Sequence, residues 1–206
     1  DNFDISAEHY FQNVGIVSGG FFYKNLSDYI YSNTTTETID GSIYRVTQPI
    51  NGKKASLYGV ELNLVRRLDF LPGALSGLDV YANYTYVKSD ATLPRGDFVL
   101  PSQAKNMGNF AVGYEQKGFS SKLSLNYSGK LPLAIGATVN DDNWLDKRWQ
   151  VDFSASQRIG KHVKVFVDLL NLANQPYRVY LGTNPNRPIQ EEIYKQWGII
   201  GVKLNF

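Results

Sequence analysis

Residues 149–156 read WQVDFSAS, and in this stretch every odd position is apolar while every even position is polar. Strict alternation is typical of a β-strand whose two faces meet different surroundings, because successive side chains point to opposite sides of a strand. The same alternation recurs in residues 78–86, 122–128, 163–169 and 200–206. No segment shows a convincing helical period. The sequence therefore predicts an all-β protein built from two-faced strands.

The spacing of the alternating segments predicts how the strands are connected. We expect about nine strands, with ends that are uncertain by a few residues. They lie near residues 2–11, 15–31, 54–68, 76–90, 101–116, 119–131, 147–159, 162–180 and 192–206. Short gaps at 12–14, 116–118 and 160–161 alternate with long gaps at 32–53, 91–100, 131–146 and 181–191, apart from an intermediate turn at 69–75. This order is typical of an antiparallel up-and-down barrel with short turns at one rim and long loops at the other, whereas a Greek-key sandwich gives no reason for it.

Composition and aromatic placement indicate a membrane barrel. Aromatic residues make up 14% of the chain, the net charge is only +2, and there is no cysteine. Such a charge balance argues against a nucleic-acid partner, and the absence of cysteine excludes disulfides and thiolate metal sites. Aromatic residues also occur at both ends of the expected strands, as in the two interfacial girdles of a membrane barrel. They are Tyr29, Tyr31, Tyr84, Tyr86 and Trp149 beside long loops, and Phe70, Phe119 and Phe206 beside short turns. A soluble β-sandwich remains the alternative, and it would purify without detergent.

Several segments resemble one known family in the order in which that family carries them. They are residues 4–11 followed by GFFYKNLSDYI at 20–30, NGKKASLYGVEL at 51–62, DLLNLANQPY at 168–177 and WGIIGVKLNF at 197–206. Together these segments resemble the C-terminal barrel of TonB-dependent outer-membrane receptors. The resemblance implies a transmembrane barrel of about 22 strands closed by an N-terminal plug. Residues 1–206 would then be the C-terminal portion of that barrel, with the plug and the N-terminal strands outside this chain.

The last residue resembles a further feature of outer-membrane proteins. Phe206 ends the chain in phase with Leu204, Val202 and Ile200. A terminal phenylalanine on an alternating strand resembles the signal that the barrel-assembly machinery reads. We therefore expect that machinery to be a partner of the protein.

The resemblance also implies a function and a location. The protein is expected to be a multi-pass β-barrel in the outer membrane of a Gram-negative bacterium, surrounded by outer-membrane lipid. It would bind an iron–siderophore, cobalamin or an oligosaccharide at its extracellular mouth and import it with energy from the inner-membrane TonB complex. The substrate itself is left open. A passive diffusion porin is the first alternative, and an upstream sequence without a plug domain would select it.

An outer-membrane enzyme, such as a barrel lipase or protease, is the second alternative. Such an enzyme needs a nucleophile and a histidine that face inward near one rim. The only histidines, His9 and His162, lie far apart in the sequence. Asp141, Asp142 and Asp146 crowd one loop, but they lack the spacing of an EF-hand, so a solvated loop is favoured over a calcium site. We therefore expect no catalytic residues, no cofactor and no bound metal.

The alternation also assigns candidate functional residues to two places. Polar side chains on the face opposite the lipid would line the lumen and contact the plug. These lumen residues are Glu61, Asp79, Asn83, Lys122, Asn126, Asp152, Arg158, Lys164, Asp168 and Lys203. Residues of the long loops would bind the ligand, because loops at an extracellular mouth meet it first. These ligand residues are Arg95, Asp97, Asn140, Asp142, Trp144, Tyr180, Asn184 and Arg187.

Overall fold

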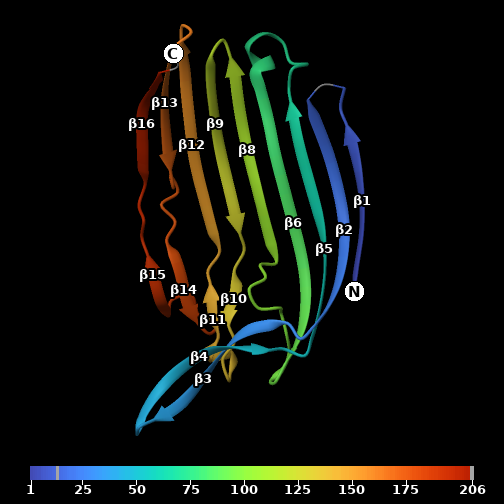
Figure 1. Cartoon of the computed structure of the whole chain (residues 1–206), viewed down its shortest axis with the longest axis vertical. Coiled ribbons are helices and arrows are strands. Elements are labelled where there is room, and N and C mark those ends of the chain that lie inside the picture. The colour runs from blue at the N-terminus through green and yellow to red at the C-terminus, as the bar shows by residue number, and fades with distance from the viewer. Residues whose placement is uncertain (13, 205–206) are drawn as a thin grey trace.

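The structure is a computed structural model that describes residues 1–12 and 14–204. One large antiparallel sheet dominates it (Figure 1), with the strand order β1-β2-β5-β6-β8-β9-β12-β13-β16. These strands are β1 (Asn2–Tyr10), β2 (Gly15–Ser27), β5 (Lys54–Arg67), β6 (Leu78–Leu93), β8 (Asn106–Gln116), β9 (Phe119–Ser128), β12 (Arg148–Ile159), β13 (Val163–Leu170) and β16 (Trp197–Leu204). A short strand, β7 (Gly96–Phe98), pairs with the end of β6. The nine strands of this sheet lie side by side in the order in which they occur in the chain, as in the wall of an up-and-down barrel.

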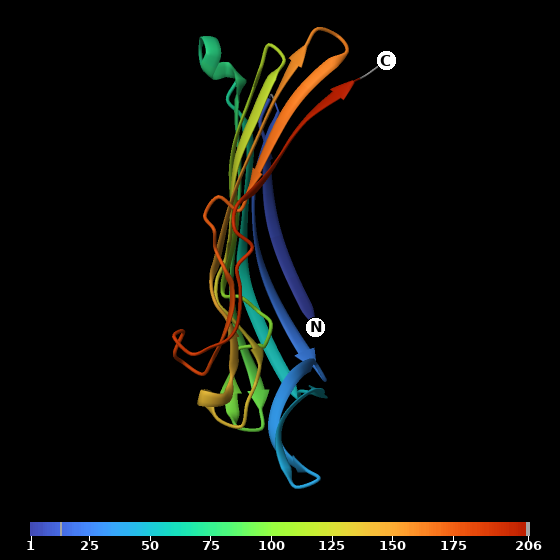
Figure 2. The ribbon, with the colours of Figure 1, turned by 90° about the vertical axis from the view of Figure 1, so that its left-hand side faces the viewer.

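The sheet is curved but not closed. Seen edge-on in Figure 2, the edges at β1 and β16 bend toward the same side, so the sheet forms a trough. Within the described residues, β1 pairs only with β2 and β16 only with β13. The architecture is therefore an open part of an antiparallel barrel.

The expected strand order is confirmed, whereas several expected strand ends were wrong. The segment expected at 15–31 stops at Ser27, because Asp28 adopts a left-handed backbone conformation with φ of 55°. The segment expected at 162–180 stops at Leu170, next to Asn171 with φ of 54°. A left-handed residue breaks the extended backbone that a ladder needs. Alternation alone did not reveal these two breaks. The strand expected from 101 also begins later, at Asn106.

The two rims differ as the loop lengths predicted. The short-turn rim carries the 3₁₀ turn η1 (Gly73–Gly77), while the long loops fold into small sheets of their own. The first is the hairpin of β3 (Ile30–Ile39) and β4 (Ser42–Asn51). The second, named here the mouth sheet, contains β10 (Leu131–Ala134), β11 (Asn143–Leu145), β14 (Tyr177–Leu181) and β15 (Pro188–Glu192), with the 3₁₀ turn η2 (Val139–Asp141) beside it. In the described part of the chain, no helix combines the length and the apolar character needed to cross a bilayer. Phe206, the expected assembly signal, lies outside the described residues.

The register sorts side chains onto two unlike faces of the large sheet. One face, named here the apolar face, carries large exposed apolar side chains from successive strands. They include Phe3, Ile5, Val17, Phe21, Val60, Leu62, Phe110, Leu123, Leu169, Ile200 and Val202. The opposite face, named here the polar face, carries rows such as Glu8, Ser18, Asn63, Asn83, Asn109, Asn126 and Gln150, which are directly paired across seven strands. An exposed apolar surface of this extent indicates an environment other than water.

Aromatic residues border the apolar face as expected, except for Tyr29 and Tyr31, which pack in a loop core. Near the long loops, Tyr84 and Trp149 are exposed, and the rings of Tyr127 and Trp149 lie 4.2 Å apart. Phe70 and Phe119 are exposed at the short-turn rim. Tyr31, which was expected in the girdle, is instead buried in the loop region with a relative exposure of 4%. It belongs to β3, and the hairpin carries it away from the strand ends.

Gly59 offers a test of how tightly the polar face is packed. A Cβ atom at Gly59 would lie 2.3 Å from the carbonyl oxygen of Tyr86 and 2.5 Å from the ring of Phe22. We expect Gly59→Ala to destabilise the barrel by about 1–3 kcal/mol, because overpacking forces ring and backbone to shift. The folded fraction of the full receptor can be measured by heat-modifiable gel migration. Gly20→Ala is the control on the same face, since a Cβ there would meet its nearest atom at an ordinary 3.4 Å; equal loss in both variants would contradict the prediction.

Candidate ligand-binding mouth and inner wall

A buried ion pair holds the loops of the mouth together. Arg95, which follows β6, donates from Nη2 to Oδ2 of Asp142 at 2.7 Å. The Asp142 side chain is fully buried, and its Oδ1 accepts from the backbone N–H of Gly136 at 2.9 Å. The guanidinium of Arg95 also lies 4.8 Å from the ring centroid of Phe98 in β7. The loop between β10 and β11 is therefore fixed to the end of β6 by charge and by hydrogen bonds.

The β3–β4 hairpin docks onto the same loop. The backbone N–H of Thr34 donates to the carbonyl of Ile135 at 2.7 Å, and that of Ile135 donates to Ser32 at 2.9 Å. Arg45 of β4 donates to the Asp141 carbonyl at 2.6 Å and to the side-chain oxygen of Asn143 at 2.8 Å. Two long loops that are far apart in the sequence are thus joined by backbone and side-chain hydrogen bonds.

A small apolar core lies beneath these contacts. Tyr31, Leu93 and Ile135 are buried against one another, with Phe98 and Ile50 packed at their edge. Burial raises the pKa of the Tyr31 phenol, while the nearby positive charge of Arg95 opposes this shift. The mouth is therefore a packed structure, unlike the solvated loops expected from the sequence.

The mouth sheet ends in a close backbone contact. Gly182 follows β14 with φ of +67°, and a Cβ atom there would lie 2.9 Å from the backbone of Asn140. The Gly182 N–H donates to the carbonyl of Asp142 at 2.8 Å. Only glycine fits both the left-handed conformation and this approach.

The structure divides the expected ligand residues into an exposed and a buried group. Asp97, Asn140, Asn184 and Arg187 are exposed at the mouth. Arg95 is half-buried in its ion pair. Trp144 is half-buried as well, and its ring forms a T-shaped contact with Phe98 in which the ring centroids are 5.9 Å apart.

Asp142 and Tyr180 require a correction. They were expected to contact a ligand at the surface, but Asp142 has a relative exposure of 0% and Tyr180 of 1%. Burial raises the pKa of the Tyr180 phenol, and the negative charge of Asp146 adds to the shift. Loop position alone predicted exposure, whereas the mouth sheet buries both side chains.

A pocket of about 510 Å³ contains residues that sequence reasoning missed. It lies where the polar face meets the mouth sheet, and its lining includes Arg148, Tyr177, Glu192, Tyr194 and Trp197. The Nε atom of Arg148 is buried there without a hydrogen-bond partner among the described residues. Tyr194 and Gln190 hydrogen-bond to Glu192, which lowers the pKa of its carboxyl group. One available signal was the phase of Trp197, which matches that of Lys203 on β16.

The expected lumen residues all project from the polar face. The ladder pairs Lys122 with Ser154 and Ser154 with Asp168, and it pairs Arg158 with Lys164 and Lys164 with Lys203. The same register places Glu61, Asp79, Asn83, Asn126 and Asp152 on this face. Two small pockets of about 330 and 230 Å³ open among these charges.

A chain of amides crosses the middle of the polar face. Asn109 donates to the side-chain oxygen of Asn83 at 2.9 Å, and Asn126 donates to that of Asn109. Asn63 continues the row on β5 and donates to Ser18 at 3.4 Å. Amides that satisfy one another in this way still offer free donors and acceptors to a further partner. Within the described residues, no group of three or more His, Cys, Asp or Glu side chains is placed to hold a metal ion.

A comparison with protein-family models decides the family. The model described as "TonB dependent receptor-like, beta-barrel" matches residues 1–172. The chain belongs to this family. TonB-dependent receptor barrels are outer-membrane transport receptors, and this assigns the open sheet to part of such a barrel wall.

Solved TonB-dependent receptors have the same fold as this chain. The unliganded ferric citrate transporter FecA aligns with a TM-score of 0.69 at 15% identity, covering 99% of this chain and 31% of that one. The copper transporter OprC aligns with a TM-score of 0.67 at 15% identity, covering 99% and 31%. The siderophore receptor PiuA from Acinetobacter baumannii aligns with a TM-score of 0.66 at 15% identity, covering 98% and 28%. No curated protein matches the chain. The chain thus spans less than a third of the length of these receptors.

Proposed function

We propose that this chain is the C-terminal wall and part of the mouth of a receptor that imports a scarce nutrient with energy from the TonB complex. Residues 1–206 would pair at β1 and β16 with the remaining strands of the same barrel. The family match over residues 1–172 carries this proposal. The polar face would line the lumen around a plug, and the apolar face would meet the lipid of a Gram-negative outer membrane. The barrel-assembly machinery would insert the protein.

The polar face supports a lumen that holds a movable plug. Its amides and mixed charges, including Asn83, Asn109, Lys122 and Asp168, have water or each other as alternative partners. Hydrogen bonds between such a wall and a plug exchange readily with water, because the net free energy of each is only about 0.5–1.5 kcal/mol. A plug bound in this way can stay folded and still shift during transport.

We propose that the ligand binds between the mouth sheet and the polar face. The pocket lined by Arg148, Tyr194 and Trp197 combines an unpaired guanidinium donor with aromatic rings, and the exposed Asn184 and Arg187 lie on the connection between β14 and β15. Aromatic faces and arginines suit an anionic chelate of a metal ion, since guanidinium groups bind carboxylates and stack on rings. A ferric chelate is therefore the first candidate, before cobalamin and oligosaccharides.

Uptake by the intact receptor tests the coupling to TonB. A strain that carries only this receptor should accumulate a radiolabelled ferric chelate, and loss of TonB or of the proton motive force should abolish uptake while surface binding persists. Uptake that continues without TonB would select the porin alternative. Hydrolysis of an ester or peptide by the purified receptor, lost with an inward-facing serine, would select the barrel-enzyme alternative.

Two tryptophans on opposite faces test the location of the ligand. Trp197 projects from the polar face into the pocket, whereas Trp149 is exposed on the apolar face. Trp197→Ala should weaken binding of the chelate about tenfold or more, because ring stacking over a ligand is lost. Trp149→Ala should leave the affinity unchanged. Equal affinities in both variants, measured on cells with equal amounts of folded barrel, would remove this pocket from the ligand site.

A further inference from the structure

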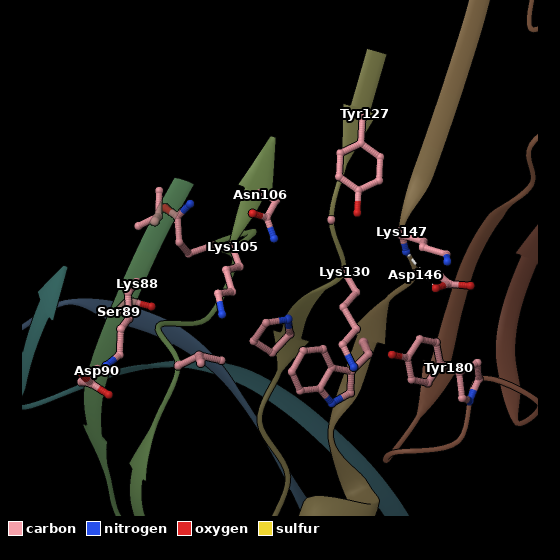
Figure 3. Close-up of a pocket in the computed structure, with 17 residues that line it drawn as sticks. Lys88, Ser89, Asp90, Lys105, Asn106, Tyr127, Lys130, Asp146, Lys147 and Tyr180 are labelled. Carbon is pink, nitrogen blue, oxygen red and sulfur yellow. Dashed lines mark hydrogen bonds between the residues drawn. The ribbon is translucent and has the colours of Figure 1, made fainter. Parts of the chain in front are cut away.

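Another pocket lies near the long-loop end of the sheet, and most of the residues of that sheet that line it have the phase of the apolar face. It has a volume of about 680 Å³ and lies between the ends of β6, β8, β9 and β11 (Figure 3). Lys88 and Asp90 on β6, Asn106 on β8 and Tyr127 on β9 line it with the phase of the apolar face. Two buried residues of β6, Val87 and Ser89, also line it and have the phase of the polar face. In Figure 3, Lys88 and Asp90 of β6 lie to the left of Asp146 and Lys147, which precede β12. In Figure 1, β6 lies to the right of β12, so the two figures view the sheet from opposite sides.

The pocket has a net positive charge. Lys88, Lys105, Lys130 and Lys147 line it and are exposed, against two carboxylates from Asp90 and Asp146. Of these carboxylates, Asp146 accepts the backbone N–H of Lys147 at 2.8 Å. The ion pairs found among the described residues are Arg95–Asp142 and Arg178–Glu191, so none of the four lysines is neutralised by one.

Three of the lysines extend across aromatic rings that border the apolar face or line the pocket. The Nζ atom of Lys88 lies 5.9 Å from the ring centroid of Tyr58, that of Lys105 lies 5.4 Å from Tyr86, and that of Lys130 lies 5.2 Å from Trp144. Tyr127, whose ring packs against that of Trp149, lines the pocket from the apolar face. Exposed lysines whose ammonium groups lie beside aromatic rings are typical of the boundary between hydrocarbon and headgroups.

The position of the pocket restricts what can occupy it. The pocket forms around β6, β8 and β9, which are each paired on both sides, so strands beyond the open edges at β1 and β16 neither complete nor cover it. An imported ligand would travel along the polar face, on the other side of the sheet. An anionic group attached to an apolar body fits both the lysines and the adjoining apolar face.

We propose that this pocket binds the phosphate-bearing headgroup of a membrane lipid whose acyl chains lie along the apolar face. The inference rests on the membrane placement given under the proposed function, but not on transport. Such a lipid would hold the ends of β6, β8 and β9 next to the mouth sheet from outside the barrel. Attraction between basic side chains and anionic lipid amounts to about fivefold in affinity for each lysine.

Lipid selectivity of the full receptor tests this inference. The receptor is reconstituted in phosphatidylcholine vesicles that contain a trace of spin-labelled phosphatidic acid or of spin-labelled phosphatidylcholine, and the motionally restricted fraction of each label is measured. The wild-type receptor should prefer phosphatidic acid about tenfold or more. Lys105→Gln combined with Lys130→Gln should remove most of this preference. Lys122→Gln combined with Lys164→Gln removes the same charge from the polar face and should keep it.

The outcomes separate the lipid from other anions and from the transport proposal. Inorganic phosphate at the concentration of the labelled lipid should not displace phosphatidic acid, and full displacement would overturn the inference in favour of a free-anion site. An unchanged preference in the Lys105 and Lys130 variant, with a normal folded fraction, would also overturn it. Neither result depends on TonB, so failure of energy-coupled uptake would leave the lipid measurement intact.

Discussion

The Arg95→Ala variant is expected to lose the folded mouth sheet, because its local stability should fall by about 3–5 kcal/mol. The variant leaves the fully buried Asp142 carboxylate with one hydrogen bond among the described residues, from the N–H of Gly136. A buried charge without its counter-charge is far more costly than the pair itself. Hydrogen exchange in the full receptor measures the effect. Amides of residues 131–145 should exchange about 100-fold faster or more, while those of β12 stay protected.

A second substitution separates charge from packing at the same place. Combining Arg95→Ala with Asp142→Asn removes the uncompensated charge but keeps an acceptor for the N–H of Gly136. Much of the protection of residues 131–145 from hydrogen exchange should therefore return. Arg187→Ala is the control, since Arg187 is exposed and forms no ion pair within the described residues. If the amides of residues 131–145 exchange at the same rate in Arg95→Ala and in Arg187→Ala, the ion pair is not what fixes the loop.

The Ala155→Arg variant is expected to reduce the amount of folded barrel strongly, whereas Ser154→Arg is not. Both residues lie in the middle of β12 at the same depth, but Ala155 belongs to the apolar face and Ser154 to the polar face. Arginine on the lipid side of a barrel near the bilayer midplane costs about 2–4 kcal/mol. At position 154 it would meet water and lie between its two cross-strand neighbours, the carboxylate of Asp168 and the ammonium group of Lys122.

Heat-modifiable migration of the full receptor measures both arginine variants. Both substitutions replace a small residue by arginine, so they increase the side-chain volume by nearly the same amount. A difference between the two variants therefore reports the face and not the volume. Greater loss in Ser154→Arg, or equal loss in both, would reverse the assignment of the two faces.

The large sheet could be predicted because each strand carries its own signal. Residues 149–156 alternate strictly, and the observed β12 runs from Arg148 to Ile159 with the polar residues of this stretch on one face. Alternation is a local property that needs no knowledge of the neighbouring strand. Gap lengths then gave the strand order. The faces of Lys122, Asp168 and Lys203 followed from the same period of two.

The mouth could not be predicted in the same way, because its structure depends on contacts between distant segments. Asp141 and Asp142 are identical neighbours in the sequence, yet only Asp142 is fully buried. The difference arises from Arg95, which is 47 residues away, and from the hairpin that Asp28 starts by leaving the extended conformation. The pocket at Arg148 and Trp197 likewise joins the start of β12 to the start of β16.

The sequence by itself determined that the chain forms two-faced antiparallel strands in a given order, and it determined which side chains share a face. Only the tertiary structure decided which loop residues are exposed to a ligand and which are buried in the mouth. The physical reason is the range of the interactions. The direction of a side chain in a strand follows from the backbone of that strand, whereas the burial of Asp142 and Tyr180 follows from the packing of loops that come together only when the sheet has formed.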